Sequence, residues 1–187
     1  MVVKFLAPAA VIGLLLNASV GNAQAVGKTA VLASDSTFIQ TAGSLGLMQA
    51  KLGKLAAENG SSSAVKDFGK RMVEEYAQAN KDLAAGAKQA AYPAPVMLRR
   101  HQEIVNRFLG MGRSSFDKNY MAEMVNQHNE AVRLFQQEAE RGRVASLKEL
   151  ASRMLPTVQQ HLSLATQTAG TVGADVTAST SGERQGS

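Results

Sequence analysis

The chain of 187 residues contains no cysteine, and this absence excludes several kinds of chemistry. Disulfide bonds, thiolate metal sites and a lipid-modified N-terminal cysteine all need a thiol. Aromatic side chains are also few, and the basic residues are scattered, with local pairs only at Arg99-Arg100 and Arg141-Gly142-Arg143. A nucleic-acid interface needs a basic stripe with rings on which bases stack. We therefore predict no nucleic-acid partner.

Long hydrophobic runs are scarce as well. The run from Phe5 to Leu16 covers twelve residues, whereas a transmembrane helix needs about 20. Lys4 precedes this run and a small-x-small site ends at Ala25, which is the pattern of a secretory signal peptide. We predict a signal peptide over residues 1–25, cleaved after Ala25, with retention as an anchor as the alternative. The protein is then exported to the periplasm, with outer-membrane association as a further expectation.

Complete catalytic motifs are missing too. The sequence has no glycine-rich phosphate loop and no nucleophile-elbow serine beside a base. These absences favour a non-enzymatic exported protein that acts by binding, in envelope maintenance or stress. Two alternatives stay open: a metal-binding bundle, and a peripheral membrane or cell-wall module. The last is suggested by the net charge of +5, which falls to +4 when Lys4 leaves with the signal peptide.

Helical periodicity is what the sequence does contain. Apolar residues recur at spacings of three and four, which is typical of amphipathic helices. We predict four long helices over residues 36–58, 63–92, 115–141 and 146–169, and a short helix over residues 96–109. The fold class is all-α: a four-helix bundle of two antiparallel hairpins with the short helix in the central connection. A linker covers residues 26–33, the bundle domain residues 34–169, and a disordered tail residues 170–187.

Each long helix carries one polar residue on its apolar stripe, 13 to 15 positions from its predicted start: Gln49, Tyr76, His128 and His161. At 1.5 Å per residue each lies about 20 Å along its helix. In antiparallel helices of similar length these positions share one level, so we predict a polar layer across the bundle. Such a layer is either a structural hydrogen-bond network or a ligand or metal site, and both interpretations stay open.

The metal interpretation depends on His128 and His161, because neutral imidazole binds divalent transition metals well. Di-iron bundles use a Glu-x-x-His motif on two helices, but Val125 and Val158 stand three residues before these histidines. A weak two-histidine site completed by water or Asp117 is the most that these residues support.

Other polar residues are expected to be solvated. Glu74 and Glu75 fall beside the apolar stripe of their helix, on its exterior. His101 lies on the short connecting helix, where an exposed role is the default.

With these residues identified, the chain resembles the bacterial exported domain-of-unknown-function family four-one-four-two, whose members are often labelled ferritin-like or outer-membrane proteins. The resemblance covers about residues 34–169. The segments that carry it are LGKLA (52–56), VKDFGKRMV (65–73), ANKDL (79–83), FDKNY (116–120), MVNQH (124–128) and LPTVQQHL (155–162).

The resemblance implies a ferritin-like bundle outside the cytoplasm, without an established activity. It also implies that Gln49 stands where members usually carry Glu, and Tyr76 where they usually carry His. With His128 and His161, those positions would make a ligand set in a typical member. Half of that set is replaced in this chain, which puts metal binding here in doubt.

Overall fold

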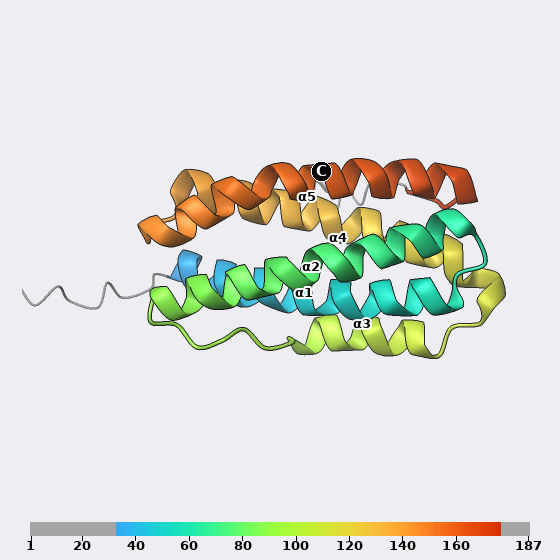
Figure 1. The fold of residues 1–187 in the computed structure, drawn as a ribbon, viewed down its shortest axis with the longest axis horizontal. Coiled ribbons are helices and arrows are strands. Elements are labelled where there is room, and N and C mark those ends of the chain that lie inside the picture. The colour runs from blue at the N-terminus through green and yellow to red at the C-terminus, as the bar shows by residue number, and fades with distance from the viewer. Residues whose placement is uncertain (1–32, 177–187) are drawn as a thin grey trace, which may run out of the picture.

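The computed structural model describes residues 33–176, which form five helices and, over that range, no strand. In chain order the helices are α1 (Ala33–Asn59), α2 (Ser63–Gln89), α3 (Arg99–Leu109), α4 (Arg113–Arg141) and α5 (Ala145–Val172). The four long helices lie side by side and the short α3 runs along α1 (Figure 1). The predicted all-α class and the short helix in the central connection are confirmed.

The apolar stripes form the core as their spacing predicts. In α1, Phe38, Leu45, Met48 and Leu52 are each 1% exposed or less, and the equivalent stripes of the other long helices are buried against them. At about 25 cal/mol per Å² of apolar surface removed from water, this shared core is the main stabilising contribution.

Two glycines allow α1 and α2 to approach closely. A Cβ atom added at Gly53 would lie 2.7 Å from the carbonyl oxygen of Gly69, and one added at Gly69 would lie 2.6 Å from the carbonyl oxygen of Gly53. Side chains at these positions would force the two backbones apart. The helix propensity lost at each glycine is therefore exchanged for tight packing between α1 and α2.

The helices form two antiparallel hairpins. α1 packs against α2 and α4 against α5, and the hairpins meet along an α1–α4 seam and an α2–α5 seam. Figure 1 shows α1 and α5 running in one direction and α2 and α4 in the other, so the helices on each side of both seams are antiparallel.

A carboxylate joins the two hairpins at each end. At one end, Oδ1 of Asp35 in α1 accepts the backbone N–H groups of Arg143 and Val144, at 2.9 and 3.3 Å, just before α5. At the other, Asp117 in α4 accepts those of Ser61 and Ser62, at 2.9 and 2.7 Å, just before α2. Each carboxylate therefore satisfies N-terminal donors of a helix in the opposite hairpin, where negative charge is also favourable.

Several predicted boundaries change. α1 begins at Ala33, so Asp35 lies inside its first turn and serves α5 instead of capping its own helix. α5 continues through Pro156 to Val172 and ends at Gly173 in a left-handed conformation, so three residues assigned to the tail are helical. The predicted signal peptide, the linker residues 26–32 and residues 177–187 lie outside the described residues. None of the helices in the described range is long and apolar enough to cross a membrane.

His101 is buried, and its predicted exposure is wrong. The side chain is 1% exposed and shares one face of α3 with Val105 and Phe108, which are also buried. Its Nδ1 lies 2.6 Å from Oγ of Ser44 in α1, and burial lowers its pKa to about 4, with the Arg100 charge adding to this effect. His101 therefore fastens α3 to α1 as a neutral side chain.

Candidate functional site

Three of the four predicted layer residues meet inside the helical core. The ring centroids of Tyr76 and His161 are 5.5 Å apart, those of His128 and His161 are 5.6 Å apart, and those of Tyr76 and His128 are 6.2 Å apart. The three rings come from α2, α4 and α5, and each residue is at most 5% exposed. The register predicted from the helix starts therefore brings these three side chains together.

His128 has both ring nitrogens occupied. Nδ1 lies 2.8 Å from the Met124 carbonyl oxygen, which can only accept, so Nδ1 carries the proton. Nε2 is then an acceptor, and the Tyr76 hydroxyl donates to it over 3.2 Å. Burial lowers the pKa of His128 to about 4, and His161 contributes to this shift. Burial and the charge of Glu75 raise the pKa of Tyr76, so both groups are neutral at neutral pH.

His161 makes its hydrogen bond outward, to Glu75. Its Nε2–H donates to Oε2 of Glu75, whose side chain is 39% exposed and also lies 3.6 Å from Nε of Arg71. The other nitrogen of His161, Nδ1, is buried and has no hydrogen-bond partner among the described residues. In the neutral imidazole with Nε2 protonated, Nδ1 is a free acceptor.

Gln49 is fully buried on the same stripe of α1 but joins no hydrogen bond. Neither atom of its amide has a partner among the described residues, and the buried hydroxyl of Tyr120 also has none. Unpartnered buried polar groups cost about 1–3 kcal/mol each. The described part of the interior therefore has unused hydrogen-bonding capacity.

The donor set does not fit a multi-ligand metal centre. Within residues 33–176, no three histidine or acidic side chains are placed to hold one metal ion. Both nitrogens of His128 are occupied, and both oxygens of Asp117 bind the start of α2, about 16 Å along α4 from His128. Asp117 is therefore at the end of the helical core and not beside the histidines. Of the two layer histidines, His161 alone keeps a ring nitrogen, Nδ1, that has no partner among the described residues and could bind a metal.

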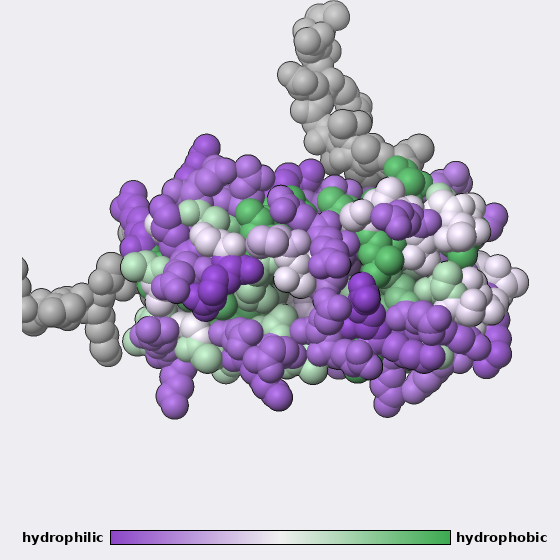
Figure 2. Space-filling view, turned by 45° about the horizontal axis from the view of Figure 1, so that its top comes forward, coloured by the Kyte–Doolittle hydropathy of each residue, from purple (hydrophilic) through white to green (hydrophobic). Residues whose placement is uncertain are grey.

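A cleft opens along the α2–α5 seam, next to the three rings. Its volume is about 260 Å³, and its apolar lining includes Ala42, Leu45, Leu83, Phe135, Leu150 and Met154. Side chains from all four long helices thus contribute to it. Figure 2, in which the top of the Figure 1 view is turned toward the viewer, shows patches of hydrophobic surface on this face, separated and surrounded by polar surface.

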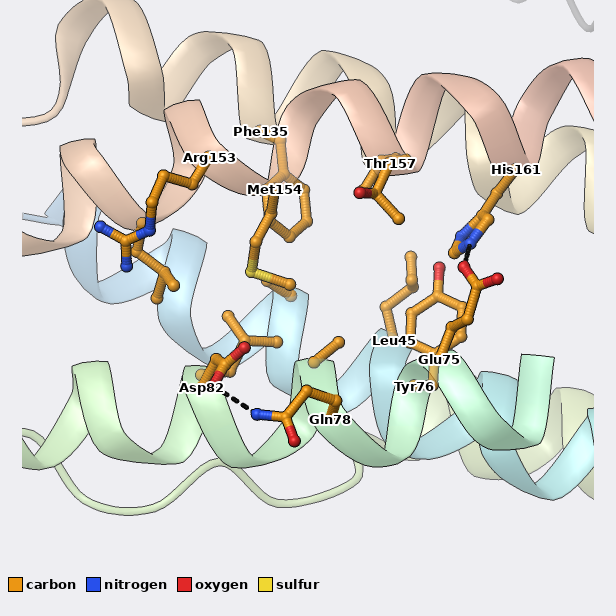
Figure 3. Close-up of a pocket in the computed structure, with 15 residues that line it drawn as sticks. Leu45, Glu75, Tyr76, Gln78, Asp82, Phe135, Arg153, Met154, Thr157 and His161 are labelled. Carbon is orange, nitrogen blue, oxygen red and sulfur yellow. Dashed lines mark hydrogen bonds and ion pairs between the residues drawn. The ribbon is translucent and has the colours of Figure 1, made fainter. Parts of the chain in front are cut away.

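Polar groups surround the mouth of the cleft in two rows. α2 contributes Glu75, Gln78 and Asp82, and α5 contributes Arg153, Thr157 and His161. Figure 3 shows the two rows facing each other, with Phe135 and Met154 in the space between the two helices and the Glu75–His161 pair at one end. Tyr76 also lines that end, and its hydroxyl is occupied by His128.

The prediction that Glu75 is merely solvated is wrong. Glu75 lies one turn from Met72 and borders the buried stripe of α2, so its carboxylate reaches across the seam to His161, 86 positions later in the chain. The only sequence signal was its position at the border of that stripe. The Glu75–His161 contact depends on how α2 and α5 pack together, and the periodicity of a single helix carries no information about that packing.

The two parts of the site differ in what they can do chemically. The Tyr76–His128 pair is a closed hydrogen-bond unit that holds its protons at neutral pH, as the pKa shifts of both groups require. The cleft, by contrast, has an apolar interior and a hydrogen-bonding rim, which is the usual build of a small-molecule site. The arrangement is therefore suited to binding.

Comparison of the sequence with models of known protein families gives a match to one family. The family model described as Domain of unknown function (DUF4142) matches residues 20–168, which is well over half of the chain, so the chain belongs to this family. Comparisons with curated proteins and with solved structures each found no match.

Proposed function

We propose, on the premise of this family membership, that the protein is a non-enzymatic binding protein. Its ligand is a small molecule with an apolar body, held in the cleft between α2 and α5. The observation that carries the proposal is the cleft itself, with its apolar floor and a rim of polar side chains from two helices. A volume of about 260 Å³ is slightly below the usual range for ligand sites, roughly 300–1,000 Å³, so the cleft suits a small ligand.

The seam position supports this function. Each hairpin packs tightly on itself, whereas the cleft lies where the two hairpins meet. Pockets between the helices of a bundle are a common place for ligands. Leu45 and Phe135 come from α1 and α4, behind the seam, and are already 1% and 3% exposed. The apolar surface that a ligand would remove from water belongs to partly buried lining residues such as Ala79 and Met154.

A titration with 1-hexanol, followed by amide NMR spectroscopy, tests the proposal. We expect saturable shifts at cleft residues such as Ala79 and Thr157. Ala79→Trp fills the cleft and should abolish them, whereas Ala77→Trp, at an exposed site on the same helix, should leave them unchanged. Absence of saturable shifts in the wild-type protein, or shifts that survive Ala79→Trp, would overturn the proposal.

The metal alternative rests on the free Nδ1 of His161. Titrations with Zn(II), Cu(II), Fe(II) and Mn(II) distinguish it, with a His128→Ala, His161→Ala double variant as the control. Stoichiometric binding that the double variant loses would favour the metal-binding function over the ligand-binding one.

We also propose that the four long helices form a ferritin-like antiparallel four-helix bundle that acts in the periplasm. The helix directions support the topology, and the signal-peptide pattern over residues 1–25 supports export. Mass spectrometry of the protein recovered from the envelope fraction should give a mature chain that begins at Val26. A full-length mass in the cytosolic fraction would contradict export.

A further inference from the structure

We infer that the cleft selects ligands whose polar end is a cation, that is, amines with an apolar body. This inference rests on the proposed binding function and names its ligand class. The chain as a whole is basic, with a formal net charge of +5. The charged groups that line the cleft are nevertheless two carboxylates, Glu75 and Asp82, and one guanidinium, Arg153.

The guanidinium of Arg153 already has a carboxylate partner. Its NH1 lies 2.7 Å from Oε1 of Glu149 on the same helix, and both side chains are more than half exposed. An anionic ligand would have to compete with Glu149 for this partner. Arg153 therefore attracts a carboxylate in the cleft less than an unpaired guanidinium would.

Asp82 retains its negative charge without a cationic partner. Its Oδ1 accepts a hydrogen bond of 2.9 Å from the neutral amide of Gln78, and no ion pair to Asp82 is found within the described range. At the other end, Glu75 accepts from His161 and lies 3.6 Å from Arg71. The uncompensated charge of the rim is thus negative and is located at Asp82.

The geometry places this charge above an apolar interior. Glu75 and Asp82 are seven positions apart in α2, so they lie on the same helix face about 10 Å from each other. Leu83 and Phe135 are buried among the apolar residues of the lining. A short alkyl chain can occupy that interior while its ammonium group remains at the rim near Asp82.

The test compares three ligands with the same apolar body: hexylammonium, 1-hexanol and hexanoate. Each is titrated into the wild-type protein, and the amide shifts of cleft residues give the Kd. We expect hexylammonium to bind roughly fivefold more tightly than 1-hexanol, since partly exposed ion pairs have modest strength, and hexanoate to bind most weakly. Added NaCl should reduce the preference for the amine, because salt screens exposed charges.

Matched variants identify the charged side chain that gives the preference for hexylammonium. Asp82→Asn should remove most of the preference for hexylammonium over 1-hexanol. Glu74→Gln, at an exposed position outside the cleft lining, should leave both affinities unchanged. Glu75→Gln should reduce the preference as well, since it removes the second carboxylate of the rim.

The outcomes separate the two proposals. Equal affinities for hexylammonium and 1-hexanol, tighter binding of hexanoate, or a preference unaffected by Asp82→Asn would each overturn the charge selection and leave the binding function standing. No saturable binding of any of the three ligands in the cleft would overturn both.

Discussion

The buried carboxyl pair formed by Asp35 and Glu138 makes stability depend on pH in a defined direction. Glu138 is 3% exposed, and burial raises its pKa from 4.5 to about 8, with Asp35 adding to the shift. Burial opposes ionisation of Asp35 too, but hydrogen bonds from the N–H of Arg143, from Glu138 and from the N–H of Val144 outweigh it and lower the pKa. Glu138 therefore holds a proton at neutral pH and donates it to ionised Asp35.

The sign of the effect follows from the raised pKa. In the folded protein Glu138 stays protonated up to about pH 8, whereas in the unfolded chain it ionises near pH 4.5. The stability it contributes is fully present below pH 4.5 and is lost as the pH rises toward 8. At 1.36 kcal/mol for each pH step between these values, the loss reaches about 3 kcal/mol at pH 7.

Glu138→Gln tests this reasoning, because glutamine keeps a donor for Asp35 but does not ionise. We expect the variant to gain about 2–3 kcal/mol of unfolding free energy at pH 7 relative to its change at pH 4.5. Urea denaturation of both proteins at the two pH values measures the difference. Glu140→Gln, at an exposed position on the same helix, should show no such difference. If Glu138→Gln changes the unfolding free energy equally at the two pH values, Glu138 does not hold a proton beside Asp35 at neutral pH.

Two further predictions concern the ends and the middle of the helical core. Asp117→Asn leaves one of two backbone N–H groups before α2 without its acceptor, so we expect a loss of about 1–2 kcal/mol in urea denaturation. Asp67→Asn, which breaks only the exposed pair with Lys70, should cost less than about 0.5 kcal/mol, and equal losses would contradict the role of Asp117. An imidazole NMR titration should show His128 neutral down to about pH 4, so the stability that depends on its neutral form is present above pH 6.5 and is lost as the pH falls through 4. A midpoint near 6.5 would exclude the closed Tyr76–His128 unit.

The helices could be predicted because their signal is local. A stripe at spacings of three and four depends only on nearby residues, and the stripe of α2, including Phe68, Met72 and Tyr76, is buried as expected. The level of the polar layer was also predictable, since it needs only helix starts and the rise per residue. This is why Tyr76, His128 and His161 meet.

The remaining interactions depend on pairings between distant segments. Asp35 and Arg143 are 108 positions apart, and nothing near either residue indicates the contact. Gly142 directly follows α4, and a Cβ atom there would lie 2.5 Å from Oε1 of Glu138, so its small size makes room for the buried carboxyl pair. The cleft likewise exists only once α2 and α5 are placed side by side.

The polar layer and the cleft have different roles in the same region. The Tyr76 hydroxyl is directed to His128 and Nε2 of His161 to Glu75, so neither of these groups is free for a ligand in the cleft. The polar layer therefore forms one end of the cleft without offering it a free hydrogen-bonding group. The polar groups left to select a ligand are at the rim, chiefly Asp82 and Thr157. Because α2 carries both Tyr76 and Asp82, the hydrogen bonds that fix Tyr76 also fix the position from which Asp82 meets a ligand. Tyr76→Phe removes the hydrogen bond to His128 without removing any rim group, so we expect it to weaken the binding of 1-hexanol measured from the amide shifts. An affinity equal to that of the wild-type protein would contradict a positioning role for the polar layer.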